Sequence, residues 1–166
     1  CYNDYGKITE IVKADEIRIP GIHNVENYLT AITAAWGEVS IDDIRYVARE
    51  FGGVEHRIEF VRELDGVKYY NDSIATSPTR VLAGLNSFNQ KLIVIAGGYD
   101  KHIPFEPMVP YVLEKVQKLY LCGNTAEKIE DAVRASLDYK GVPEIIRCEN
   151  IEDAVNKAQE RAKKGD

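Results

Sequence analysis

LIVIAGGYDK, residues 92–101, is the stretch that decides the fold class of this chain. Its first five residues form a continuous apolar run, which is typical of a strand buried on both faces of a parallel sheet. Gly97 and Gly98 follow the run at once, and glycine lets the backbone turn sharply or approach a ligand closely. The stretch therefore predicts a buried strand whose carboxyl end carries a polar loop.

Strand-like and helix-like patterns alternate on both sides of this stretch. Such alternation, from about residue 67 onward, predicts a parallel sheet with helices on both faces. Ser77 followed by Pro78 marks one helix start, Asn124 with Glu127 resembles a capping box, and Asn150 is a further expected N-cap. Besides 92–96, strands are predicted at 67–70, 119–122 and 145–148, and helices at 78–88, 107–116, 124–137 and 150–162.

The first third of the chain has a different pattern. Lys7–Ile19 alternates apolar and polar residues and predicts one or two edge strands, and His23–Trp36 has helical spacing. Ser40 is the expected N-cap of a second helix, whose buried stripe would be Ile44, Val47, Ala48 and Phe51. Gly52-Gly53 predicts a linker, and Asp65-Gly66 predicts the turn of a hairpin between Arg57–Leu64 and Val67–Tyr70. The expected division is 1–52 and 53–166.

Composition limits the class of protein. The chain has 166 residues, of which 45% are apolar and 29% charged, as in ordinary globular domains. Its net charge of −6, without a basic stripe, argues against nucleic acid or an anionic membrane as the main partner. The first fifteen residues do not have the pattern of a signal peptide, and no apolar run approaches the length of a membrane span. The abrupt ends lead us to expect a piece of a longer protein.

Cysteine and histidine give no metal signal. The three cysteines are odd in number and, like the three histidines, lack ligand spacing, so no metal site is predicted. Cys122 and Cys148 each end an apolar run and are expected to be core residues. This usage fits a reduced, cytoplasmic setting.

Polar residues collect after the predicted strands, where open parallel sheets bind ligands. Lys101 could offer a cation to a carboxylate or phosphate, or be a solvated lysine beyond a tight turn. Asp72 could accept from a ribose, or Asn71-Asp72-Ser73 could form a local turn. Thr76, with Ser77 and Thr79, could bind an anion at a helix start or serve as ordinary capping.

Two further candidates lie nearer the start of the chain. Arg57 could reach a nucleotide phosphate, or be a solvated surface charge. Asn24 and Asn27 begin a helix with His23, where N-capping is the simpler account. The sequence lacks the phosphate-binding pattern G-x-x-x-x-G-K-[ST] and the dinucleotide pattern G-x-G-x-x-G.

Four of these stretches together resemble the Mur ligases in order and spacing, and the resemblance covers nearly the whole chain. Within that family, the sequence is most similar to the branch that adds D-glutamate to UDP-N-acetylmuramoyl-L-alanine. Some relatives have a lysine at the position of Ile74. The four stretches are Pro20–Asn27, His56–Glu59, Tyr70–Pro78 and Ala96–Lys101.

The resemblance implies a Rossmann-like, doubly wound, mostly parallel sheet over 53–166, preceded over 1–52 by a remnant of a central ATP-binding α/β domain. It implies an ATP- and Mg²⁺-dependent amide ligase of peptidoglycan synthesis that works through an acyl phosphate. Asn24 and Asn27 would face the adenine end of ATP, and Arg57 and Asp72 its phosphate and ribose region. Thr76 and Lys101 would bind the D-glutamate carboxylates. No catalytic residue or metal ligand is assigned to this chain, and alone it is expected to be inactive.

Two other interpretations stay open at this stage. One is a sister amide ligase, such as a folate polyglutamylating enzyme, with the same fold and another acceptor. The other is a non-catalytic module that binds a nucleotide or an amino acid.

Overall fold

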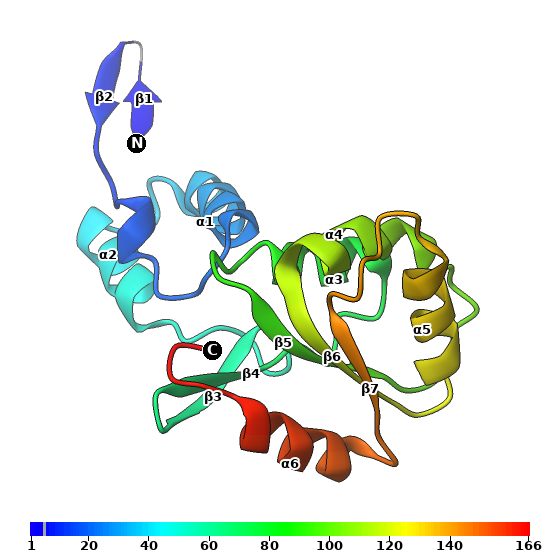
Figure 1. Cartoon of the computed structure of the whole chain (residues 1–166). Coiled ribbons are helices and arrows are strands. Elements are labelled where there is room, and N and C mark those ends of the chain that lie inside the picture. Colours follow the sequence, from blue (N-terminus) through cyan, green and yellow to red (C-terminus); the bar gives the residue numbers. More distant parts are fainter. Residues whose placement is uncertain (5) are drawn as a thin grey trace.

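The computed structural model describes residues 1–4 and 6–166, in which two antiparallel hairpins and one parallel sheet are combined with helices (Figure 1). The elements of the first half are β1 (Tyr2–Asp4), β2 (Lys7–Thr9), the 3₁₀ turn η1 (Ala14–Glu16), α1 (Ile22–Ala35), α2 (Ile41–Glu50), β3 (Glu59–Leu64), β4 (Val67–Asn71) and α3 (Pro78–Leu85). Those of the second half are β5 (Leu92–Gly97), η2 (Glu106–Met108), α4 (Val109–Lys115), β6 (Val116–Cys122), α5 (Ala126–Ala135), β7 (Glu144–Arg147) and α6 (Ile151–Arg161).

The parallel sheet has the strand order β5-β6-β7, and its central strand separates two apolar layers. Leu119 and Leu121 of β6 pack with buried side chains of α3, α4 and α5. Tyr120, between them in sequence, lies on the opposite face with Ala154 and Ala158 of α6. This follows from the period-2 alternation of a strand, and each fully buried leucine contributes about 1.5–3 kcal/mol. Figure 1 shows α4 and α5 on one side of this sheet and α6 on the other.

The predicted α/β class with helices on both faces is confirmed, but the parallel sheet is narrower than predicted. β4 pairs antiparallel with β3 alone, so the β3–β4 hairpin forms a sheet of its own. One outward-facing amide of β4, that of Lys68, instead donates to the carbonyl of Asp166 at 3.0 Å. β5 is consequently an edge strand and only half-buried, where burial on both faces was predicted.

The hairpin itself forms as predicted around Asp65 and Gly66, which have φ values of 53° and 77°. Left-handed conformations at both central residues are what a two-residue turn needs to match the twist of its strands. The end of the chain lies against this turn, because Gly165 N donates to Gly66 O at 2.9 Å.

Only part of Lys7–Ile19 is a strand, which corrects the predicted one or two edge strands. β2 pairs antiparallel with β1, and the strand ends at Thr9. The carbonyl of Ile11 then accepts from Nε of Arg45 at 2.6 Å, and Glu16 pairs with Arg49. Side chains of α2 thus bind this segment in place of a neighbouring strand.

The second helix begins as predicted but buries less than predicted. Ser40 and Asp43 form a reciprocal capping box at the start of α2. Ile44 and Ala48 are buried, whereas the predicted stripe residues Val47 and Phe51 are 49% and 42% exposed. Tyr28 of α1 donates its hydroxyl to the carbonyl of Val47 at 3.2 Å, but the Val47 and Phe51 side chains stay only partly covered.

Three helix boundaries in the second half can be compared with the prediction: the starts of α5 and α6 and the end of α4. Thr125, not Asn124, is the N-cap residue of α5, and it makes no side-chain capping bond. Asn150 caps α6 as predicted, with Oδ1 accepting from Asp153 N at 2.9 Å. The predicted helix 107–116 stops at Lys115, since β6 begins at Val116. Among the helices of residues 1–4 and 6–166, none combines the length and apolar character of a membrane span.

Candidate functional site

Two of the sequence motifs, His56–Glu59 and Asn71–Ile74, lie against each other at the end of the β3–β4 hairpin. The amide of Ile58 donates to Oδ1 of Asp72 at 3.1 Å, and the amide of Ile74 donates to the carbonyl of His56 at 3.2 Å. Nδ2 of Asn71 lies 2.9 Å from Nδ1 of His56. The alternative of a purely local Asn-Asp-Ser turn is therefore incomplete, because the Asp72 carboxylate bonds across to another segment.

The backbone beside Arg57 is wound into an unusual conformation. His56 and Ile58 have φ values of 63° and 46°, and a left-handed conformation is costly for a β-branched residue. Ile58 is buried, while Arg57 between them is exposed. The strained turn thus fixes the position from which the Arg57 guanidinium projects.

Asp72 lies in a mixed electrostatic environment. Burial raises the pKa of its carboxyl above the usual value, and the Ile58 N–H bond, His23 and Arg57 act in the opposite direction. Its Oδ2 also lies close to α3, because an added Cβ on Gly84 would be 2.6 Å from that oxygen. Asp72 is therefore held by the structure on one oxygen and packed against a helix on the other.

The start of α1 lies near this motif, and its polar side chains bond to one another. Nδ2 of Asn24 donates to Pro20 O at 2.6 Å, and Nδ2 of Asn27 donates to Oδ1 of Asn24 at 3.3 Å. Asn24 is buried, and Asn27 is exposed. The N-cap residue is Gly21, so the N-capping account of His23, Asn24 and Asn27 is wrong.

The loop after β5 is fastened to the loop after β6. Gly97 has a φ of 133°, and an added Cβ would lie 1.7 Å from the carbonyl oxygen of Cys122. The carbonyl of Gly98 accepts from Thr125 N at 3.2 Å. An added Cβ on Gly98 would meet nothing within 4 Å. Gly97 is thus required by backbone packing, and Gly98 lies beside open space.

Among the described residues Lys101 has no hydrogen-bond or ion-pair partner, although Asp100 beside it has two. Asp100 accepts from the Lys128 ammonium and, at 2.8 Å, from the amide of His102. The Lys128 bond, followed by the His102 bond, holds the pKa of Asp100 below its usual range. Lys101 is exposed and makes no hydrogen bond or ion pair with any residue that the structure describes.

Thr76 is exposed just before α3. Its amide donates to Ile74 O at 2.8 Å, while its hydroxyl bonds to none of the described residues. Ser77 is the N-cap residue of α3, but its hydroxyl lies 3.2 Å from that of Thr79 and makes no capping bond. Thr76 and Asp72 share one loop, and no described contact joins that loop to Lys101.

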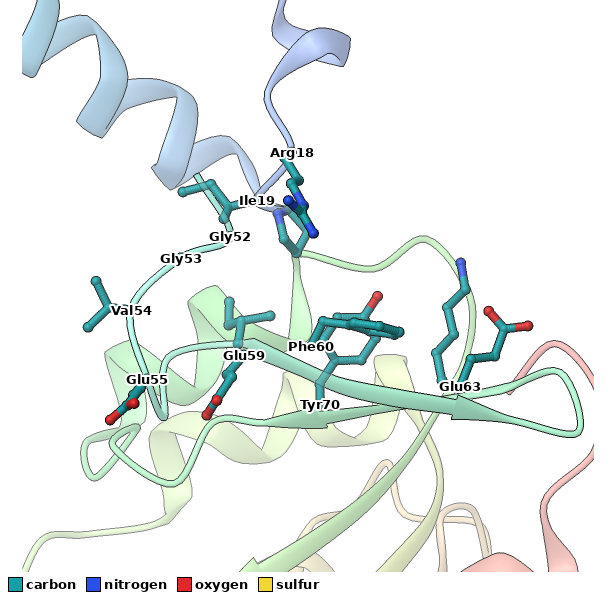
Figure 2. Close-up of a pocket in the computed structure, with 13 residues that line it drawn as sticks. Arg18, Ile19, Gly52, Gly53, Val54, Glu55, Glu59, Phe60, Glu63 and Tyr70 are labelled. Atoms are coloured by element: carbon teal, nitrogen blue, oxygen red, sulfur yellow. The ribbon is translucent and has the colours of Figure 1, made fainter. Parts of the chain in front are cut away.

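A cleft of about 540 Å³ lies between the β3–β4 hairpin and two other segments, residues 18–20 and 52–55 (Figure 2). Figure 2 shows Arg18 above the rings of Phe60 and Tyr70, which meet edge to face with centroids 5.5 Å apart. Sequence reasoning missed this cleft, since only the aromatic residues of the hairpin strands could have pointed to it. None of the six predicted site residues lines it. Its lining is Arg18, Ile19, Pro20, Gly52, Gly53, Val54, Glu55, Ile58, Glu59, Phe60, Glu63, Lys68 and Tyr70.

The family profile described as "Mur ligase, glutamate ligase domain" matches residues 56–166, which include the hairpin, the Asp72 loop and the whole parallel sheet. This chain belongs to the Mur ligase family. The resemblance inferred from the four sequence motifs is thereby confirmed.

Curated relatives extend the similarity to residues before the matched domain. The chain is 54% identical over 162 residues to UDP-N-acetylmuramoylalanine--D-glutamate ligase of Acetivibrio thermocellus, and 51% identical over 158 residues to that of Clostridium perfringens. Each match covers 95% of this chain and 34% of the relative. This Mur ligase chain therefore spans about a third of the length of the relatives it matches.

Solved Mur ligase structures share the fold. A UDP-N-acetylmuramoyl-L-alanyl-D-glutamate--2,6-diaminopimelate ligase matches with a TM-score of 0.54 and 20% identity, covering 89% of this chain and 32% of that chain. MurF from Acinetobacter baumannii matches with a TM-score of 0.57 and 17% identity, covering 84% of this chain and 32% of that chain. These likenesses support the α/β, Rossmann-like architecture alone.

Proposed function

We propose that this chain is part of an ATP-dependent amide ligase of peptidoglycan synthesis, which joins D-glutamate to UDP-N-acetylmuramoyl-L-alanine. The observation that carries the proposal is the identity of 54% over 162 residues to a D-glutamate ligase. Residues 1–52 would be the tail of a central ATP-binding domain, and 53–166 most of the domain that follows it. A cytoplasmic location would accord with the three free cysteines among the described residues.

The nucleotide side of the site would be formed by two segments, His56–Glu59 and Asn71–Ile74, which the hydrogen bond from Ile58 to Asp72 holds together. Arg57 projects from a strained, and therefore well-defined, turn, and its guanidinium can bind a phosphate through two parallel hydrogen bonds. Asp72 lies beside it and would accept from the ribose. Because Asn24 is buried and accepts from Asn27, we assign the direct contact with adenine to Asn27 and a supporting role to Asn24.

The amino-acid side would be formed by Lys101 and Thr76. The exposed Lys101 ammonium has no partner among the described residues, so it is free to bind a carboxylate. The loop that carries it is fixed by the bonds of Gly98 to Thr125 and of Asp100 to Lys128. The Thr76 hydroxyl would donate to the D-glutamate carboxylate from the loop before α3.

In the reaction, the γ-phosphoryl group of ATP passes to the alanyl carboxylate, which gives an acyl phosphate and ADP. The amine of D-glutamate then attacks the carbonyl carbon, loses a proton, and phosphate leaves. This chain would supply binding and orientation, which can lower the barrier by holding the two reactants in a reactive geometry. Closure of the two segments about the Gly52-Gly53 linker would bring the reactants together.

Mg²⁺ would accompany ATP and neutralise charge on its phosphates. In residues 1–4 and 6–166, no group of three or more His, Cys, Asp or Glu side chains converges in a way that could hold a metal ion. The proposal assigns no metal ligand and no step through the metal to this chain.

The assignment of Lys101 is tested by Lys101→Ala in the full-length ligase. Loss of a charge-assisted hydrogen bond, about 1.5–3 kcal/mol, is expected to raise the KM for D-glutamate about 10- to 100-fold. The KM for ATP is expected to change much less. Lys91→Ala is the matched control, because Lys91 is an exposed lysine at the opposite end of the same strand. Equal KM values for D-glutamate in variant and parent would overturn the assignment.

The substrate itself is tested by phosphate release from ATP with a panel of acceptors and amino acids. Release that depends on both UDP-N-acetylmuramoyl-L-alanine and D-glutamate is the expected result. Release that depends on a folate acceptor and L-glutamate would instead identify a sister ligase. Nucleotide binding without phosphate release under any pairing would identify a non-catalytic module.

A further inference from the structure

Cys122 and Cys148 lie opposite each other at the carboxyl ends of two neighbouring parallel strands. Leu121 of β6 is in register with Arg147 of β7. The next residue, Cys148, continues the ladder, because its amide donates to the carbonyl of Leu121 at 2.8 Å. In a parallel ladder this bond places Cys148 opposite Cys122, one step beyond the last paired residues.

Both thiols lie on the same face of the sheet. Tyr120 packs against α6 on that face, and strand alternation places Cys122 on it as well. Cys148 packs against the same α6 cluster. Neighbouring strands are about 4.7–4.9 Å apart, and a disulfide accepts Cα–Cα separations of about 4.4–6.8 Å. The backbone spacing is therefore compatible with a bond between the two sulfur atoms.

The surroundings of the two thiols differ. Cys122 is 9% exposed, whereas Cys148 is half-buried and thus the more accessible sulfur. Burial raises the pKa of the Cys148 thiol, Lys157 of α6 acts in the opposite direction, and Asp153 of α6 and Cys122 of β6 raise it further. A thiol that is mostly protonated reacts slowly, so we expect oxidation of this pair to be slow.

We propose that Cys122 and Cys148 form a modification site, in which a hydroperoxide converts the two thiols to an intramolecular disulfide. The Cys148 thiolate attacks a peroxide oxygen, the O–O bond breaks, and a sulfenic acid and one molecule of alcohol or water result. The Cys122 sulfur then attacks the Cys148 sulfur, the S–S bond forms, and the sulfenic oxygen leaves as water with the remaining proton. Both cysteines are oxidised, and the peroxide is reduced.

The site is connected to the loop that carries Lys101. The carbonyl of Cys122 abuts Gly97, and an added Cβ on Gly123 would lie 2.9 Å from the amide nitrogen of Gly98. Because the Cys122 backbone packs directly on this loop, any shift of Cys122 that accompanies formation of the S–S bond would displace the loop. If the proposed function holds, this displacement lowers the affinity of the ligase for D-glutamate. Formation of the disulfide does not depend on that function.

The disulfide is tested on this chain carrying Cys1→Ser, since Cys1 is exposed and could form bonds between molecules. The folded chain is treated with hydrogen peroxide, alkylated without reduction, digested, and analysed by mass spectrometry. A linked pair of peptides that contain Cys122 and Cys148, and that dithiothreitol separates, is the expected result. Two free thiols in folded chain, or over-oxidised Cys148 without a linkage, would overturn the proposal.

Denatured chain treated in the same way is the control, and linkage there but not in folded chain would equally overturn the proposal.

The consequence for the loop is tested in the full-length ligase. Peroxide is expected to raise the KM for D-glutamate several-fold, dithiothreitol to restore it, and Cys122→Ala to abolish the effect. An unchanged KM in protein that contains the disulfide would overturn the coupling to the loop and leave the disulfide in place.

Discussion

The amide of Ile58 donates to Oδ1 of Asp72 at 3.1 Å, and this bond joins the exit of the Gly52-Gly53 linker to the loop after β4. Ile58 is buried with a φ of 46°, so its amide could not readily find water as another acceptor. The bond therefore does two things: it maintains a strained turn, and it fixes Arg57 relative to Asp72.

Gly84→Ala is expected to break this bond from a distance. The new Cβ would lie 2.6 Å from Oδ2 of Asp72, so the carboxylate must move away from Ile58. Leaving the buried amide unpaired costs about 1–3 kcal/mol, and alanine returns about 1 kcal/mol of helix propensity. A net loss of up to about 2 kcal/mol in the free energy of unfolding, measured with urea, is expected. Gly52→Ala is the control, because its Cβ meets nothing within 4 Å. Equal stability of the two variants would contradict this account.

Gly97→Ala and Gly98→Ala form a matched pair of variants. Together they distinguish the cost of backbone strain from the cost of a steric clash between the new Cβ and a neighbouring backbone. Both glycines have left-handed φ values, 133° and 124°, so both substitutions cost about 1–3 kcal/mol in strain. Only Gly97→Ala also drives a Cβ against the Cys122 carbonyl, at 1.7 Å. The urea midpoint is expected to fall clearly further for Gly97→Ala. A larger fall for Gly98→Ala would show that the two loops do not pack as described.

Much of the fold could be predicted because local chemistry and tertiary structure agree. The Asp65-Gly66 turn, the Ser40 N-cap and the apolar run of β5 depend on neighbours in sequence, and each forms where expected. The failures depend on distant residues. The separation of β4 from the parallel sheet involves Asp166, and the exposure of Val47 depends on what lies beside α2.

The candidate site likewise has features that the sequence could predict and features that it could not. Lys101 lies, as predicted, in a polar loop after the carboxyl end of a parallel strand. Asp72 also follows a strand, but that strand, β4, belongs to the separate antiparallel hairpin and not to the parallel sheet. The bond from Ile58 to Asp72 could not be predicted, because no sequence pattern indicates that an isoleucine will adopt a positive φ. The closeness of Gly97 to Cys122 was equally hidden, since a glycine required by packing looks like one required by a ligand.

Asn150→Ala and Asn124→Ala test the corrected helix starts. Asn150 Oδ1 accepts from Asp153 N, and losing an N-cap costs about 0.5–2 kcal/mol. Asn124 is exposed and makes no capping bond, because Thr125 is the N-cap residue of α5. The thermal midpoint is thus expected to fall for Asn150→Ala and to stay near that of the parent for Asn124→Ala. The reverse order would restore the capping box first predicted from sequence.

Glu130 of α5 is expected to contribute to stability in a pH-dependent way. Its hydrogen bonds with Arg147 and Arg134 hold the pKa of its carboxyl below the usual value of 4.5. A group whose pKa is lower in the folded state stabilises the fold above its unfolded pKa, and that contribution is lost as pH falls through the folded value. Glu130→Gln should therefore reduce the free energy of unfolding at neutral pH, with the difference from the parent shrinking as the pH drops below 4.5.

Urea titrations across this pH range measure the difference between Glu130→Gln and the parent. Added salt should also shrink this difference, since both arginines are half-exposed. Glu127→Gln is the control, because Glu127 lies on the same helix and forms no ion pair with a described residue. A difference that grows toward acid pH would have the wrong sign for a carboxylate held by two arginines.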